Sequence, residues 1–177
     1  SRPEFIDSII NRAKEFNLKD YDHVMFSYHG IPERHVDKVY LDGKPCADHS
    51  CENEINDENT NCYKATCYAT TRLLAEALNI STDFHSTCFQ SRLGRDPWLM
   101  PYTDHVIEKL AKEGKKKILV FSPAFVSDCL ETTIEIGEEY DELFKEHGGE
   151  KLQLVPSLND YDDWAENLTK IIKDYTK

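Results

Sequence analysis

Helical and strand patterns alternate along this chain from end to end, and this alternation limits the fold more than any other feature. Apolar residues at helical spacing predict helices at 3–16, 63–78, 103–113, 128–147 and 163–175, and short apolar runs predict buried strands at 23–28, 84–90, 118–121 and 152–155. Helices that alternate with buried strands are typical of a parallel sheet covered on both faces. The sequence therefore predicts a single α/β domain over residues 1–177, with a four-stranded parallel sheet and helices on both faces.

One segment, at about 33–62, does not follow the alternation. It is polar, rich in turn residues and contains three cysteines. A loop of this length in a compact domain is either functional or an insertion. In the helix that follows it, we expect Leu73, Leu74, Ala77 and Leu78 to face the core.

The charge of the chain argues against one class of partner. Its 177 residues include 21 basic and 33 acidic side chains, for a net charge of −12, whereas a nucleic-acid-binding protein needs a basic surface. The longest near-apolar run, residues 118–126, is too short to cross a membrane, and no signal peptide is visible. These features predict a cytoplasmic protein that does not bind nucleic acid.

Four of the six cysteines are close together in the sequence. Cys46, Cys51, Cys62 and Cys67 have the spacing C-x4-C-x10-C-x4-C. Without a secretory signal, this grouping favours a metal site or free thiols over disulfides. Four thiolates on a loop suit a [2Fe–2S] cluster or a zinc ion, although the spacing is not that of a tight zinc ribbon. A cluster, zinc and unligated thiols all remain open at this point.

Polar residues follow three of the predicted strands. His29, next to Gly30, follows the first strand, the loop at 90–98 follows the second, and the turn at 127–131 follows the third. Ligands of open parallel sheets bind outside the carboxyl ends of the strands, so we expect these features to converge on one site. No glycine-rich phosphate loop follows any strand, and a nucleotide-binding fold has no support.

A row of acids lies on the longest predicted helix. Glu131, Glu135 and Glu139 recur at every fourth residue, a spacing at which like charges weaken a helix slightly. The row indicates either a solvated face or a path for cations. At the start of the same helix, Asp128 and Glu131 also fit a capping box, which needs no function.

The loop after the second strand combines aromatic and basic side chains. Trp98 and Tyr102 occur near Arg92 and Arg95 in an otherwise acidic chain. Aromatic faces with nearby guanidinium groups suit a flat anionic ligand, through stacking and pairing with carboxylates. An ordinary loop anchored by its tryptophan is the simpler alternative.

Three motifs together resemble the ferrochelatase family. They are FSYHGIP at 26–32, FQSR at 89–92 with PWL at 97–99, and SDCLET at 127–132, in the family's order and with similar separations. The resemblance runs from about Pro3 to the last helix. It implies one Rossmann-like half of a two-half class II chelatase fold, specifically the C-terminal half, of the type found in proteobacteria.

The resemblance also implies roles for particular residues. His29 matches the active-site histidine and Glu131 the acid that faces it across the porphyrin, while Glu135 and Glu139 match a line of acids that leads metal inward. Trp98 matches an aromatic residue of the porphyrin pocket. We expect Gln90, Ser91 and Tyr102 to contact substrate as well. The segment from Cys46 to Cys67 resembles the insertion that carries a [2Fe–2S] cluster in some bacterial members.

The implied reaction is insertion of ferrous iron into protoporphyrin IX to give heme. In this hypothesis His29, neutral near pH 7, takes a pyrrole proton or touches the incoming metal, and Glu131 acts on the opposite side. The implied partners are porphyrin, ferrous iron and the missing N-terminal half, without which this chain alone is expected to have little activity. Contact with a membrane surface stays open. Two alternatives are a non-enzymatic iron–sulfur or zinc-binding module and a chelatase for another tetrapyrrole.

Overall fold

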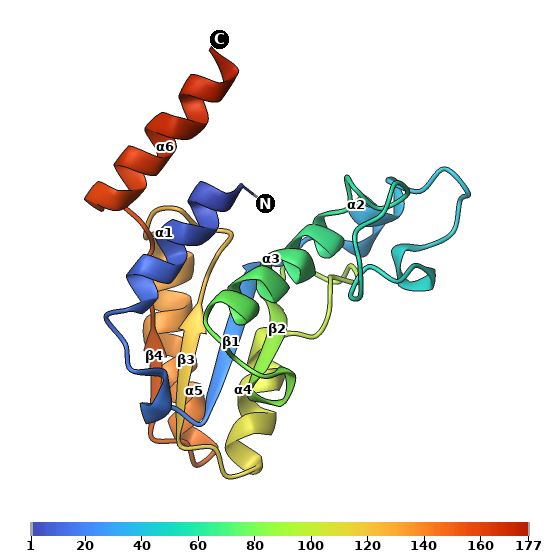
Figure 1. The fold of residues 1–177 in the computed structure, drawn as a ribbon. Coiled ribbons are helices and arrows are strands. Elements are labelled where there is room, and N and C mark those ends of the chain that lie inside the picture. The colour runs from blue at the N-terminus through green and yellow to red at the C-terminus, as the bar shows by residue number, and fades with distance from the viewer. Residues whose placement is uncertain (1, 177) are drawn as a thin grey trace.

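The computed structural model describes residues 2–176 as a four-stranded sheet with helices on both sides (Figure 1). The strands pair in parallel in the order β2-β1-β3-β4. The strands and helices are α1 (Pro3–Ala13), β1 (His23–His29), α2 (Glu33–Asp37), α3 (Tyr63–Ala77), β2 (His85–Gln90), α4 (Thr103–Lys112), β3 (Lys117–Phe121), a π-helix (Glu131–Glu139), α5 (Tyr140–Glu146), β4 (Lys151–Leu154) and α6 (Asp162–Tyr175), with short 3-10 turns at Leu18–Asp20, Cys46–Asp48 and Thr82–Phe84. The predicted α/β class and parallel sheet are confirmed.

Alternate residues of the central strands form two separate cores. Val24 and Phe26 of β1 pack with α1 and α3, and the Phe26 ring stacks on Phe121 of β3 at 5.3 Å. Met25, between them in β1, faces the opposite side with Val120, where α4, the π-helix and α5 cover the sheet. Successive side chains of a strand point to opposite faces, so these apolar runs require helices on both sides.

The inner face of α3 differs from the prediction. Leu74 is buried, but the Leu73 side chain is 41% exposed and Ala77 is also exposed. Thr71 is buried instead, because its hydroxyl pairs with the Tyr28 hydroxyl at 3.0 Å and accepts a hydrogen bond from Thr87 at 3.1 Å. A buried hydroxyl with satisfied hydrogen bonds can replace an apolar side chain at such a position.

The helix predicted at 128–147 begins later and has two parts. Residues Glu131–Glu139 form a π-helix that continues into α5, and π-helical turns are frequent at functional sites. The capping-box interpretation is wrong. The Asp128 carboxylate accepts hydrogen bonds from the Ser157 N–H at 3.0 Å and the Asn159 amide at 2.8 Å, which ties this turn to the loop after β4.

The segment predicted as a loop at about 33–62 contains α2 and a 3-10 turn, and it lies beside the N-terminal end of α3 (Figure 1). At the other side, α6 packs on α1 and extends beyond the sheet (Figure 1). Its Trp164 ring lies 5.9 Å from Phe5, while Ile172 and Tyr175 are exposed. Within residues 2–176, no helix is long and apolar enough to cross a membrane.

Candidate functional site

His29 is the last residue of β1, at the carboxyl end of the sheet. Its ring Nδ1 lies 2.5 Å from the carbonyl oxygen of Gly30. A carbonyl only accepts, so Nδ1 carries a proton, and in the neutral form of the ring the lone pair is on Nε2. The ring is half-buried, with its centroid 6.0 Å from Phe125 and 6.5 Å from Trp98. One nitrogen is therefore fixed, and the other can take a proton or a metal ion.

Trp98 reaches this position because its loop is held against the end of β1. The Leu99 N–H donates to the Ile31 carbonyl at 3.0 Å, and the Trp98 indole N–H donates to the Leu93 carbonyl at 2.9 Å. Gly30 makes the close approach feasible. A Cβ at this residue would lie 2.9 Å from the Gln90 carbonyl oxygen and 3.3 Å from the Trp98 ring. A side chain there would separate the two segments.

Gln90 is buried in the interior of the domain. It is 1% exposed, its amide oxygen accepts from the Ser27 hydroxyl at 2.8 Å, and its amide N–H donates to the Glu131 carbonyl at 2.9 Å. A buried amide with both ends bonded connects β2 to the first turn of the π-helix. The structure thus gives Gln90 contacts that position the π-helix, and its contact with substrate stays a prediction.

The Glu135 carboxylate is held by four donors. Its Oε1 accepts from the Ser91 N–H and the Tyr140 hydroxyl, both at 2.9 Å, and its Oε2 accepts from the Ser91 hydroxyl at 2.6 Å and the Gln90 amide at 3.4 Å. Ser91 has a φ of +65°, an unusual conformation for a residue other than glycine, and it aims both of its donors at the same carboxylate. Burial raises the pKa of Tyr140, which keeps its hydroxyl a donor. Glu135 thus joins β2 to the π-helix.

Glu131 and Glu139 have fewer hydrogen-bond partners than Glu135. The backbone N–H of Glu131 itself, Cys129 and the charge of His29 lower the pKa of Glu131, so this carboxylate is ionised at neutral pH. Glu139 is exposed, and within residues 2–176 its carboxylate has no hydrogen bond or ion pair. Both acids border a surface hollow of about 430 Å³, which is lined by Leu130, Glu131, Ile134, Glu135, Glu139 and Tyr140.

Tyr102 belongs to a different contact group from Trp98. The Arg92 guanidinium lies 4.2 Å from the centre of the Tyr102 ring and makes two hydrogen bonds to Asp104, at 2.7 and 3.0 Å. His105 packs edge-on against the same ring at 5.4 Å. Arg92 already has a carboxylate partner, which weakens the expectation that it and Tyr102 recognise an anionic ligand together.

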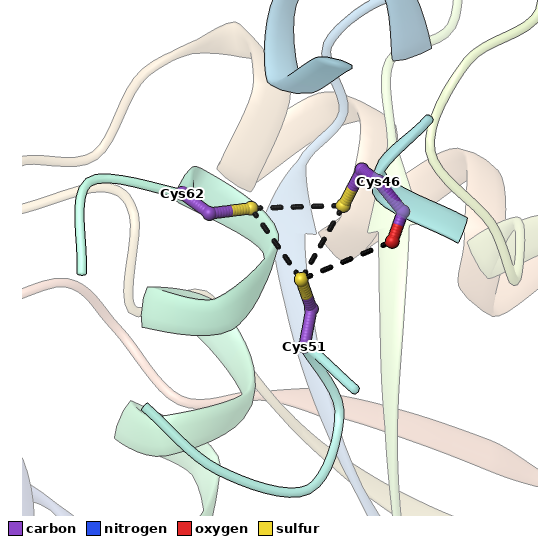
Figure 2. A group of neighbouring side chains, drawn as sticks. All are labelled: Cys46, Cys51 and Cys62. Carbon is purple, nitrogen blue, oxygen red and sulfur yellow. Dashed lines mark hydrogen bonds between the residues drawn. The ribbon is translucent and has the colours of Figure 1, made fainter. Parts of the chain in front are cut away.

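Three of the four predicted cysteine ligands converge. The sulfurs of Cys46, Cys51 and Cys62 lie 3.5, 3.7 and 3.8 Å apart and point toward one another (Figure 2). All three residues are buried, and hydrogen bonding from Cys46 lowers the pKa of Cys62. Cys67 is buried as well but does not belong to this group of neighbouring ligand atoms.

This geometry is a poor fit for a [2Fe–2S] cluster. Such a cluster takes two cysteines on each iron, and the two pairs lie on opposite sides of the iron–sulfide core. Three sulfurs that are all within 3.8 Å of one another do not divide in this way. The cysteine group is a candidate metal centre, and the cluster remains a prediction from the resemblance alone.

The fold and this group of residues define an α/β domain of the parallel-sheet class, with an imidazole and a row of carboxylates at the carboxyl ends of the strands. Comparison with known proteins gives the family, because the model described as Ferrochelatase matches residues 1–176. A ferrochelatase of Pseudomonas fluorescens SBW25 is 43% identical over 96% of this chain, and one of Legionella pneumophila strain Lens is 43% identical over 98%. The chain belongs to the ferrochelatase family. It spans about half the length of these curated relatives, 50% and 51% respectively.

Several residues that build the site were missed in the sequence. Tyr140 and Ser27 hold Glu135 and Gln90, and the Tyr63 hydroxyl donates to the His29 carbonyl at 2.8 Å. Phe125 packs near the His29 ring. Tyr140 lies five residues after Glu135, which would have been a signal only if the π-helix had been expected.

Proposed function

We propose that this chain is the C-terminal half of a ferrochelatase, and that the protein carrying it inserts ferrous iron into protoporphyrin IX to give heme. One observation carries the proposal. Gln90, which pairs with His29 in the sheet, donates its amide N–H to the Glu131 carbonyl at 2.9 Å. The end of β1 and the first turn of the π-helix are therefore held side by side, with the imidazole on one and the carboxylate on the other. Family membership supports assigning iron and porphyrin as the substrates.

Metal insertion has to remove two protons from the pyrrole nitrogens and water from the ferrous ion. His29 is suited to accept a pyrrole proton at Nε2, because Nδ1 already donates to the backbone. Glu131 remains charged and suits the task of stabilising the incoming cation. A positioned base contributes roughly 10²–10⁴-fold to such a reaction.

The surroundings of the two residues suit a flat apolar ligand and a second half-domain. Val126, Leu130 and Ile134 are 46%, 74% and 37% exposed, although they are next to or within the site. Exposed apolar groups that adjoin functional residues commonly mark a binding surface. We assign this surface to the porphyrin and to the N-terminal half that longer relatives contain.

The test is porphyrin metallation by the protein that contains this chain, with anaerobic ferrous iron. His29→Ala and Glu131→Gln should each lower kcat at least 100-fold while the unfolding midpoint in urea stays near wild type. His35→Ala and Glu138→Gln are matched controls, because both residues are exposed and should leave activity unchanged. Near-normal turnover in His29→Ala would refute the assignment.

Two finer points remain proposals. Relative turnover with Fe²⁺, Co²⁺ and Ni²⁺ on several tetrapyrroles would separate a ferrochelatase from another chelatase. The [2Fe–2S] cluster on Cys46, Cys51, Cys62 and Cys67 stays an expectation of the resemblance alone, which two irons and two sulfides per chain would support. We keep the cytoplasmic location and contact with a membrane surface as predictions, to be checked by fractionation.

A further inference from the structure

The spacing of the three cysteine sulfurs is that of ligands around one ion. In a tetrahedral site with metal–sulfur bonds of about 2.3 Å, neighbouring sulfurs are about 3.8 Å apart. The observed separations are 3.5, 3.7 and 3.8 Å (Figure 2). A disulfide would bring two sulfurs to about 2.05 Å, and these are far beyond that distance.

The three ligands come from different parts of the chain. Cys46 begins the 3-10 turn, Cys51 lies in the loop after it, and Cys62 precedes the first residue of α3. They are 3%, 0% and 0% exposed. Three buried thiols in mutual contact, contributed by three different local structures, suit a thiophilic cation.

Cys67 is poorly placed to join them. It lies five residues beyond Cys62 along α3, and the helical rise carries it about 7.5 Å along the axis and to another face. It packs in the α1–α3 core instead and lines a separate hollow with Tyr28 and Trp164. The cysteine that would complete a four-cysteine ligand set is thus directed elsewhere.

Tyr40 closes the open side of the cysteine group. Its hydroxyl lies 2.6 Å from the Cys51 sulfur and 3.9 Å from the Cys46 sulfur. The His49 ring stacks on the Tyr40 ring at 3.7 Å and 8°, and His49 in turn lies 3.5 Å from the Asp42 carboxylate. The stacked His49 ring therefore holds the phenol with its oxygen beside two of the three sulfurs.

We propose that Cys46, Cys51 and Cys62 bind one divalent cation of the Zn²⁺ class in a tetrahedral site, with the Tyr40 hydroxyl at the fourth position. Binding replaces three thiol protons by the ion, and three protons pass to solvent. The site fastens the segment after α2 to the start of α3. Tyr40 also lines a hollow of about 620 Å³ that Asp42, Asp57 and Glu58 border, and these acids attract cations to the neighbourhood of the cysteine group.

The first test is metal content of the protein carrying this chain, purified anaerobically from cells grown with both zinc and iron. We expect one zinc and no acid-labile sulfide per chain. Cys46→Ser, Cys51→Ser and Cys62→Ser should each lose the zinc, and Cys67→Ser should keep it. Cys88→Ser is the matched control, because Cys88 is equally buried but packs in the other core.

The second test uses cobalt and does not require the variants to fold. Metal-free wild-type protein titrated with Co²⁺ should give thiolate-to-metal bands and the intense visible bands of a tetrahedral ion, saturating at one equivalent. Tyr40→Phe should keep the stoichiometry but shift the visible bands and weaken binding about tenfold. These readouts are independent of chelatase activity, so they separate this proposal from the proposed function.

Two results would overturn the proposal. The first is two irons and two sulfides per chain, in a brown protein that loses its colour in Cys67→Ser, because this identifies a [2Fe–2S] cluster with Cys67 as a ligand. The second is metal-free protein that gives no cobalt bands on titration, because this leaves the cysteines as free thiols.

Discussion

Replacing Glu135 by glutamine tests whether its carboxylate stabilises the fold through its hydrogen bonds or serves only as a metal ligand. An ionised carboxylate has about four lone-pair positions, and all four at Glu135 face protein donors. In Glu135→Gln one oxygen becomes an amide nitrogen, so two of these donors would meet another donor. Hydrogen bonds to charged groups contribute roughly 1.5–3 kcal/mol each, and rotation of a hydroxyl recovers part of the loss. We expect the free energy of unfolding to fall by roughly 2–4 kcal/mol.

The assay is urea unfolding of the protein carrying this chain, followed by circular dichroism, with turnover measured on the same samples. Glu139→Gln is the matched control, because this exposed acid on the same helix should change stability by less than about 0.5 kcal/mol. A role for Glu135 only as a ligand on the metal path predicts lost activity with unchanged stability. If Glu135→Gln has the wild-type free energy of unfolding, the stabilising role of Glu135 is refuted.

Two further predictions concern the ends of β1. Burial and nearby positive charge lower the pKa of His23 from 6.5 to about 4, so between these pH values the unfolded chain binds a proton that the folded chain does not. The free energy of unfolding should therefore fall by roughly 1–2 kcal/mol as the pH drops from above 6.5 to 5. Urea unfolding of His23→Gln should no longer show this pH dependence, whereas His35→Gln should retain it. Gly30→Ala should lower the free energy of unfolding by roughly 1–3 kcal/mol and change the fluorescence of Trp98, because the added Cβ would lie 2.9 Å from the Gln90 carbonyl oxygen. An unchanged emission spectrum and urea midpoint would show that the Trp98 loop moves aside without cost.

The sequence predicts the sheet well because its strands are buried on both faces. A run such as Val24 to Phe26 has no polar residue to solvate, so it has to lie between two layers of helices. The same reasoning fails for α3. Thr71 looks polar by residue type, but hydroxyl partners on the neighbouring strands allow it to be buried, and Leu73 is left at the surface. Partners across the fold are not visible in a local pattern.

The sequence alone indicates where the candidate site residues lie, but it does not distinguish the three glutamates from one another. The ends of the strands indicate that His29 and the acids converge, because parallel strands share one carboxyl edge. The sequence treats the three glutamates as equivalent, since they have the same spacing. The π-helix makes them different by placing Tyr140 and Ser91 on the middle carboxylate only. Whether a helix is α or π depends on its packing, and a spacing of four residues in the sequence does not distinguish the two.

Tyr63 connects the cysteine group to the candidate active site through one hydrogen bond to the backbone. It follows Cys62, and its hydroxyl donates to the carbonyl of His29 at 2.8 Å, while the His29 ring is fixed through the next carbonyl along the chain. An ion bound at the start of α3 would therefore also fix the position of the His29 backbone. This connection requires neither electron transfer nor delivery of iron from the cysteines. A redox-inactive ion is sufficient for it, which agrees with three sulfurs that lie 3.5, 3.7 and 3.8 Å from one another.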